Sequence, residues 1–270
     1  MITRYRISLN GSQLDQLLVN DYGANALVIL NVGCVKPSFV KTVETPASRD
    51  GGLITKSYRD KATVNVSFML RIYDVAQRNA ACQKIKTWAA AGGYIRINDR
   101  NSQTLYNAVC DEYPEIESAR DWTEPLTMSF SSYVFPYWQD TTQTAFSATG
   151  TNITGTLKAP GNAPKGYVTA EITPMNGTMT NIEVNVGSTK IKVTGISVTT
   201  SGKLIIDYDS QMNIRIRRLV GSTYTSYLDK RSTDSTDDLL AVPGKDNSVS
   251  VKTTSNIRVK ADLKVRGAWL

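Results

Sequence analysis

The sequence contains no histidine, and this absence removes the residue on which many catalytic sites depend. Histidine is the usual general base near neutral pH, a common zinc ligand and the usual partner of a serine or cysteine nucleophile. Paired carboxylates remain available for hydrolysis, but Asp111/Glu112 and Asp237/Asp238 are adjacent in sequence, as in solvated turns. We therefore expect a protein that is not an enzyme and that binds no metal or other cofactor.

Cysteines and long apolar runs are also scarce. The three cysteines, Cys34, Cys82 and Cys110, lack C-x-x-C spacing, so we interpret them as buried small hydrophobic residues rather than metal ligands. The longest aliphatic run is 26–30, far short of the roughly 18 residues of a membrane span. The N-terminal MITRYRISLNG lacks the continuous apolar core of a secretory signal, which predicts synthesis in the cytoplasm.

Charge is distributed unevenly along the chain. Residues 1–140 carry 15 Lys+Arg against 14 Asp+Glu (+1), whereas residues 141–270 carry 16 against 10 (+6). In this second half, basic residues recur at even spacings, as on the solvent face of an antiparallel sheet: Lys190/Lys192, Arg215/Arg217 and Lys260/Lys264. Because no Arg-rich helix or aromatic ribonucleoprotein motif accompanies them, we favour a solvated sheet over a nucleic-acid surface.

One segment, DVAQRNAACQKIKTWAAAGG at 74–93, predicts a long helix in a chain otherwise typical of strands. Asp74 is a suitable N-cap, and the glycine pair at 92–93 a suitable stop. Ala81, Ile85, Trp88 and Ala89 form one apolar stripe, while Arg78, Lys84 and Lys86 are expected on wetter faces. Ile85 and Trp88 are therefore the predicted core of a contact between this helix and a sheet.

The strand pattern predicts that sheet and divides the chain. Alternation is clearest at 62–72, where Ala62, Val64, Val66, Phe68, Leu70 and Ile72 share one face. Residues 139–165 are rich in Thr, Ser, Gly, Ala and Pro, which we interpret as a linker with at most one short strand. About eight short strands at 166–270 predict a β-sandwich or jelly roll. The predicted organisation is an N-terminal domain (1–138), the linker (139–165) and a C-terminal β-sandwich (166–270).

The order of features in the first half resembles the N-terminal domain of siphophage distal tail proteins. The resemblance covers roughly residues 1–140, and these features carry it: Arg49-Asp50-Gly51, Tyr58, the alternating strand 64–70, a helix ending in Lys86-Thr87-Trp88, the turn at 95–101, Leu105-Tyr106 and Met128-Ser129-Phe130. One departure is Tyr137 after Pro136, where the family commonly has a second proline. In the second half, Asn162-Ala163-Pro164 and the terminal VKADLKVRGAWL also resemble this family.

The resemblance implies a structural role. Family members form a hexameric ring at the distal end of the tail tube, joining the tail tube protein to the tail-tip hub or baseplate proteins, with DNA passing through the lumen without specific binding. The implied fold is mainly β: an N-terminal β-sandwich-like, tail-tube-related domain with one α-helix, then a galectin-like sandwich that can carry lateral receptor-binding proteins. Arg49, Asp50, Gly51 and Tyr58 would lie at a subunit interface, or in an ordinary surface hairpin. The implied location is the virion tail, after synthesis in the host bacterial cytoplasm.

The residues leave two other functions open. The first is a host-surface receptor or carbohydrate-binding module, in which the C-terminal sandwich recognises a sugar. Sugar platforms usually need an aromatic ring beside polar groups, and after the linker the only tryptophan is Trp269, which we expect to pack the last strand. The second is a glycan hydrolase that uses two carboxylates.

Overall fold

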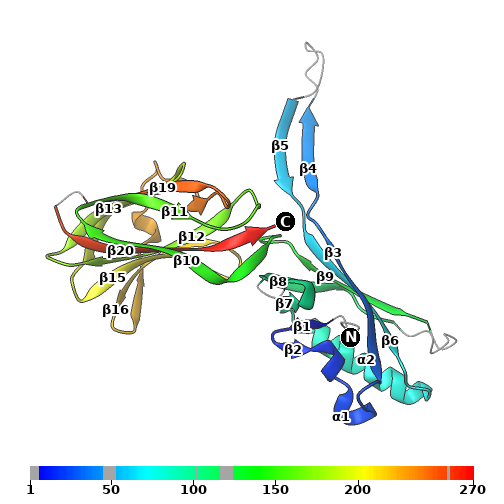
Figure 1. Ribbon diagram of the computed structural model, residues 1–270. Coiled ribbons are helices and arrows are strands. Elements are labelled where there is room, and N and C mark those ends of the chain that lie inside the picture. The colour runs from blue at the N-terminus through cyan, green and yellow to red at the C-terminus, as the bar shows by residue number, and fades with distance from the viewer. Residues whose placement is uncertain (1–5, 45–52, 101–102, 116–123, 254–255) are drawn as a thin grey trace. The chain divides into compact units, whose positions relative to one another are not determined.

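The computed structural model describes residues 6–44, 53–100, 103–115, 124–253 and 256–270 of the chain (Figure 1). The chain forms two compact units: unit 1 is Met1–Trp138 with Leu270, and unit 2 is Gln139–Trp269. Strands dominate both units, which confirms the predicted mainly β fold class. None of the helices in the described ranges is both long and apolar enough to cross a membrane.

The core of unit 1 is built from one antiparallel sheet and one long helix, α2 (Val75–Ala90). In hydrogen-bonded order its strands are β2 (Ser12–Gln13), β1 (Ile7–Leu9), β7 (Gly93–Ile97), β8 (Gln103–Glu112), β9 (Leu126–Ser132), β6 (Ala62–Leu70) and β3 (Leu27–Val35). The predicted alternation at 62–72 is confirmed, because all six apolar residues of that face are buried. One face of β6 is therefore the centre of the unit 1 core.

The predicted helix is α2 (Val75–Ala90), and it covers this core. Asp74 is its N-cap and accepts a hydrogen bond from the Gln77 backbone N–H at 2.8 Å. Ile85 is fully buried, and the Trp88 ring meets Phe130 of β9 edge-on at a centroid distance of 5.9 Å. The expected contact between helix and sheet is present at the residues that the sequence indicated.

The predicted position of Arg78 on a solvent-exposed face of the helix is wrong. We expected it on a wet face, but only 7% of its surface is exposed. The reason is helical spacing, since Arg78 lies three and seven positions before Ala81 and Ile85 and so joins their stripe. A long arginine side chain can bury its aliphatic stem at the edge of such a stripe.

Two smaller expectations for unit 1 are also corrected. The sequence 14–19 alternates weakly and predicts a short strand, but this segment forms a 3-10 turn, η1 (Leu14–Gln16), and the start of a short helix, α1 (Val19–Tyr22). Of the three cysteines only Cys82 is fully buried, whereas Cys34 and Cys110 are partly exposed. Cys34 lies on an edge strand and Cys110 near the end of β8, where the sheet gives incomplete cover.

Unit 2 is a two-sheet sandwich, as predicted (Figure 1). The first sheet has the order β17 (Thr223–Ser226), β16 (Ile214–Val220), β15 (Gly202–Tyr208), β12 (Gly166–Pro174), β20 (Val259–Trp269) and β10 (Trp138–Gly150), with β18 (Leu240–Ala241) also paired to β12. The second has the order β11 (Asn152–Lys158), β19 (Asp246–Thr253), β13 (Met179–Val186) and β14 (Thr189–Val198). All eight strands expected at 166–270 are present. Their inward side chains form one apolar core.

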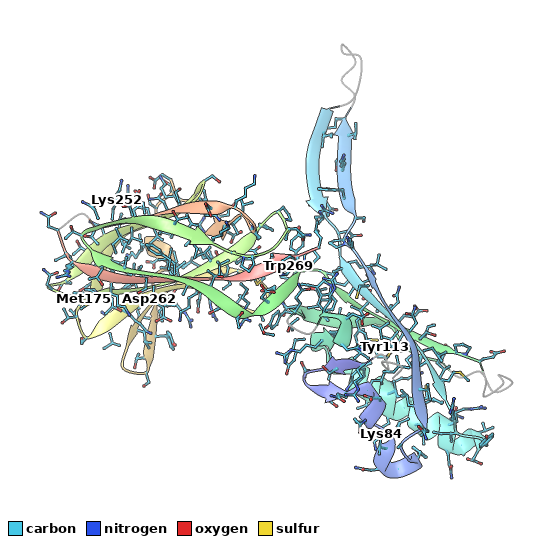
Figure 2. The ribbon with its side chains drawn as sticks, in the orientation of Figure 1. Lys84, Tyr113, Met175, Lys252, Asp262 and Trp269 are labelled. Carbon is cyan, nitrogen blue, oxygen red and sulfur yellow. The ribbon has the colours of Figure 1, made fainter. Side chains whose placement is uncertain are left out.

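The interpretation of 139–165 as a linker is wrong. Most of this segment forms β10 and β11, which belong to the two sheets of the sandwich. Trp269, labelled in Figure 2, lies at the end of β20. Its indole N–H donates a hydrogen bond to Asp140 of β10 at 2.9 Å, and a Cβ added to Gly267 would lie 2.0 Å from the same carboxylate. Thr has a high β propensity although it is polar, so strands rich in it resemble a polar linker in sequence.

Ion pairs hold most of the evenly spaced basic residues of unit 2 on the outside of the sheets, where they were predicted. Arg215 and Arg217 both bind the Asp207 carboxylate, Arg215 with a contact of 2.9 Å. Lys260 lies 3.0 Å from Asp262. These acidic partners offset part of the positive charge of the evenly spaced basic residues.

The outer edge of β14 is covered by the segment that follows the 3-10 turn η3 (Leu228–Lys230). The Ser232 and Thr236 backbone N–H groups donate to the carbonyls of Lys192 and Lys190, both at 2.8 Å. In return the Lys192 N–H donates to the Ser235 hydroxyl at 3.0 Å. This cover satisfies backbone groups that would otherwise form an exposed sheet edge.

The Asp234 carboxylate makes the stability of this segment depend on pH. A hydrogen bond from the Ser232 hydroxyl and the ion pair with Lys190 at 2.9 Å lower the pKa of Asp234 from 3.8 to about 2. Because the folded-state pKa is depressed, the stability that the carboxylate contributes is present above pH 3.8 and is lost as the pH falls toward 2. We expect an NMR titration midpoint near 2 and a difference in unfolding free energy between wild type and Asp234→Asn that shrinks across this window. A midpoint near 3.8 would contradict the pairing.

Candidate assembly interface

A two-stranded hairpin in unit 1 carries four large apolar side chains that are more than half exposed. It consists of β4 (Phe39–Glu44) and β5 (Leu53–Arg59), which pair with each other as a separate sheet, and we call it the arm (Figure 1). The exposed fractions are 57% for Phe39, 56% for Val43, 52% for Ile54 and 56% for Tyr58. An isolated hairpin is at best marginally stable in water, so an arm with this surface needs a partner.

The predicted interface residues fall on the arm and on the segment between its strands. Tyr58 lies on β5 opposite Val40, where its ring is available to a partner. Arg49, Asp50 and Gly51 lie outside the described residues. The guanidinium of Arg59 stacks on the Phe39 ring at 3.9 Å and donates to the Pro37 carbonyl at 3.0 Å, which fixes the root of the arm.

A polar network lies next to the root of the arm. Lys61, two residues after β5, forms a 2.8 Å ion pair with Asp111, and the Tyr133 hydroxyl donates to the same carboxylate at 3.0 Å. Partial burial pushes the pKa of Asp111 upward, but hydrogen bonds from Lys61, Ser131 and Tyr133 outweigh it and hold the pKa below its usual value. The same hydrogen bond with Asp111 raises the pKa of Lys61. Both groups therefore stay charged, and their pairing ties the residue before β6 to β8.

The strand β3 leads into the arm and forms an open edge of the unit 1 sheet. Among the described strands it pairs with β6 alone, so its other side presents unpaired backbone groups. Its sequence, LVILNVGCV, has no charge and no proline, and it is interrupted only by an irregularity between Ile29 and Asn31. Leu30 and Val35 are exposed. Natural proteins usually protect an edge of this length with charges or prolines, so this edge is suited to pairing with another chain.

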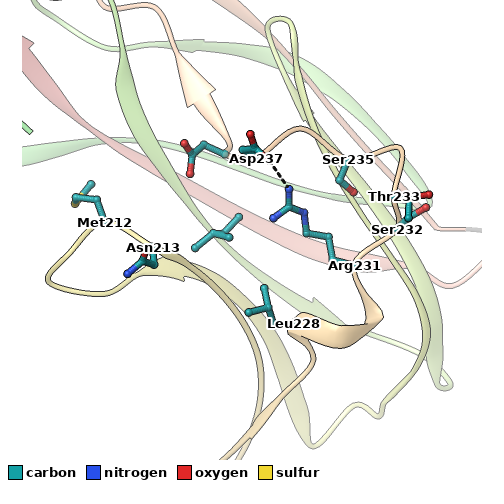
Figure 3. Close-up of a pocket in the computed structure, with 10 residues that line it drawn as sticks. Met212, Asn213, Leu228, Arg231, Ser232, Thr233, Ser235 and Asp237 are labelled. Atoms are coloured by element: carbon teal, nitrogen blue, oxygen red, sulfur yellow. Dashed lines mark hydrogen bonds and ion pairs between the residues drawn. The ribbon is translucent and has the colours of Figure 1, made fainter. Parts of the chain in front are cut away.

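A second surface feature, which the sequence analysis did not find, lies in unit 2 (Figure 3). A hollow of about 660 Å³ opens between the turn that precedes β16 and the segment that follows η3. These residues line it: Met212, Asn213, Ile214, Leu228, Arg231, Ser232, Thr233, Ser235, Asp237 and Asp238. They are dispersed over 27 positions, 212–238, on both sides of β16 and β17, and no motif connects them. Across the described chain, no three His, Cys, Asp or Glu side chains are grouped to hold a metal ion.

Comparison with solved structures finds relatives of this fold. The chain matches the crystal structure of SPP1 Dit (gp 19.1), described as a paradigm of the hub adsorption apparatus in phages that infect Gram-positive bacteria. The TM-score is 0.65 at 16% identity, over 98% of this chain and 99% of that one. Two structures of the phage P2 baseplate in its activated conformation, with Ca and with Sr, match at TM-scores of 0.45 and 0.46 and identities of 9% and 8%. The matches cover 99% and 97% of this chain and 98% and 97% of those chains.

Comparison by sequence finds no protein-family model and no curated protein that matches the chain. The likeness to SPP1 Dit extends along nearly the full length of both chains. The resemblance to distal tail proteins that the sequence indicated is therefore confirmed at the level of the fold.

Proposed function

We propose that this chain is a structural subunit of a bacteriophage or prophage tail, and that it forms a ring hub at the distal end of the tail tube. The observation that carries this proposal is the full-length likeness to SPP1 Dit, a protein described as a hub of the adsorption apparatus. The likeness spans both unit 1 and unit 2. It therefore covers both units and not a single common sandwich.

The surface of unit 1 supports assembly into a ring. The open edge of β3 is nine residues long, whereas the opposite edge of the same sheet is the two-residue strand β2. We expect β3 and the arm of one copy to contact a different surface of its neighbour, because a contact of the same surfaces closes a dimer and not a ring. Such head-to-tail contacts close into a ring when the rotation between copies is regular, and they cover both the edge and the exposed arm residues.

The proposed partners follow from the hub role. One face of the ring would contact the tail tube protein, the other the tail-tip hub protein, and unit 2 would offer positions for lateral receptor-binding proteins. Six copies are expected from the resemblance, with DNA passing through the lumen without specific binding. The chain would be made in the host bacterial cytoplasm, would reside in the virion tail and would have no catalytic activity.

Immunogold labelling tests the location. Antibodies raised against unit 2 should mark the distal end of the tail, at the junction of tube and tip, on particles of the phage or prophage that encodes the chain. Antibodies against the major tail tube protein serve as the control and should mark the whole tube. Label along the tube, on the capsid or nowhere on the particle would overturn the hub assignment.

A further inference from the structure

A smaller hollow, of about 260 Å³, lies in unit 1 where β2, β1 and β7 run side by side, and we call it the arginine hollow. Ser8 of β1 pairs with Gln13 of β2 on one side and with Arg96 of β7 on the other, so these three side chains share one face of the sheet. It is the face opposite the core, because the residues on either side of Ser8 and Arg96 are buried. Arg6 and Asn98 line one end of the hollow.

Two guanidinium groups give the arginine hollow its charge. The Arg96 Nε–H donates to the Thr104 hydroxyl at 3.0 Å, and within the described residues the other nitrogens of Arg96 make no hydrogen bond. The Arg6 Nε lies 3.8 Å from the Asp15 carboxylate, a distance too long for a hydrogen bond. None of the described residues that line the hollow is acidic. Two positive charges therefore line one hollow with no carboxylate hydrogen-bonded to either in the described chain.

The groups around these charges are ordered and can donate hydrogen bonds. The Arg6 backbone N–H donates to the Asn98 side-chain oxygen at 3.1 Å, and the Asn98 N–H donates to the Arg6 carbonyl at 3.3 Å. The Ser8 hydroxyl and the Gln13 amide add neutral donors, and neither side chain is hydrogen-bonded elsewhere in the described segments. An anion that enters the hollow therefore meets donors on a backbone that is already fixed.

We infer that the arginine hollow receives the carboxylate of an Asp or Glu side chain from a partner protein. The planar guanidinium fork matches a carboxylate in two parallel hydrogen bonds. A hollow of about 260 Å³ lies below the roughly 300–1,000 Å³ of sites for small molecules, so its size suits one side chain. Binding to a nucleic-acid backbone usually neutralises several phosphates, whereas this hollow offers two cations.

Fluorescence anisotropy on the full chain tests the inference at low ionic strength. The probe is the peptide Gly-Ser-Glu-Glu-Ser-Gly with a neutral fluorophore, and Gly-Ser-Gln-Gln-Ser-Gly is the uncharged comparison. We expect the wild type to bind the Glu peptide alone, and Arg6→Gln/Arg96→Gln to weaken that binding at least about tenfold. Arg71→Gln/Arg258→Gln is the matched control, because it removes two charges at exposed positions outside the hollow. Its affinity should stay within about twofold of the wild type, since charges far from the hollow are screened.

The contrary outcomes are distinct. Equal weakening by both double variants would trace the binding to net charge, and equal binding of the two peptides would show that the carboxylates are not recognised. Either result overturns the inference, as does a wild type that binds neither peptide. Binding of a labelled DNA duplex in place of the Glu peptide, lost in Arg6→Gln/Arg96→Gln, would assign the hollow to a phosphate and overturn the protein partner.

The arginine hollow is formed by strands other than β3 and the arm, on which the ring proposal rests. Arg6→Gln/Arg96→Gln should therefore keep the oligomeric state of the wild type in native mass spectrometry. A wild-type ring that this variant fails to form would assign the hollow to a second copy of the chain and overturn a separate partner. A monomeric wild type that binds the Glu peptide through both arginines would support the hollow and count against the ring alone.

Discussion

Replacing Val43 and Ile54 with lysine should leave a folded chain that no longer forms rings. The two residues lie opposite each other on β4 and β5 and are both more than half exposed, so neither contributes to the core of the free subunit. In a ring, each would bury apolar surface worth about 1.5–3 kcal/mol. Losing both contacts should weaken each subunit contact by at least about 100-fold. Native mass spectrometry at micromolar concentration should then show monomers where the wild type shows a ring.

A matched substitution separates loss of the interface from added charge. Val242 is an exposed valine of unit 2 and not part of the arm, and Val242→Lys adds one lysine there, half of the charge that the arm variant adds. This variant should form rings as the wild type does. Circular dichroism should be the same for all three proteins. Rings that persist in the arm variant would show that the arm is not part of the subunit contact.

Trp88→Ala should lower the unfolding free energy by about 3–5 kcal/mol, the range for removal of a buried aromatic side chain. Only 8% of Trp88 is exposed, its ring meets Phe130, and its indole N–H donates to the Ser12 carbonyl at 3.3 Å. The substitution therefore removes the contact that joins α2 to β9 and to β2. Denaturant unfolding of the full chain, following a signal from unit 1, measures the loss.

Gln83→Ala is the control for Trp88, because Gln83 lies on the exposed face of the same helix. Its effect should stay within about 0.5 kcal/mol. A loss for Trp88→Ala of less than about 1 kcal/mol would mean that α2 does not depend on this contact. Failure of Trp88→Ala to form rings would follow from its instability and would not locate the interface.

The sequence predicted those parts of the fold that rest on local patterns. The β6 alternation, the Asp74 cap and the Ile85/Trp88 contact are periodic or local signals, and the structure contains each of them. The eight strands of 166–270 were predictable for the same reason. Arg78 shows the limit, since its charge suggested solvent while its spacing placed it on the buried stripe.

Other features depend on pairings that no local pattern reveals. β10 and β11 resemble a linker because partners distant in sequence, β20 and β19, are what make them strands. The hollow in unit 2 likewise arises where a turn near Met212 meets a segment near Arg231. For the interface, the sequence indicated Tyr58, but the exposure of the whole arm and the open edge of β3 became evident only once sheet neighbours were known.

Cryo-electron microscopy of the purified full-length chain tests the central claim most directly. We expect a closed ring of identical subunits with an axial hole, in which the open edge of β3 and the arm are covered by the neighbouring subunit. A strict monomer at micromolar concentration, or a ring that leaves both β3 and the arm exposed to solvent, would contradict the account.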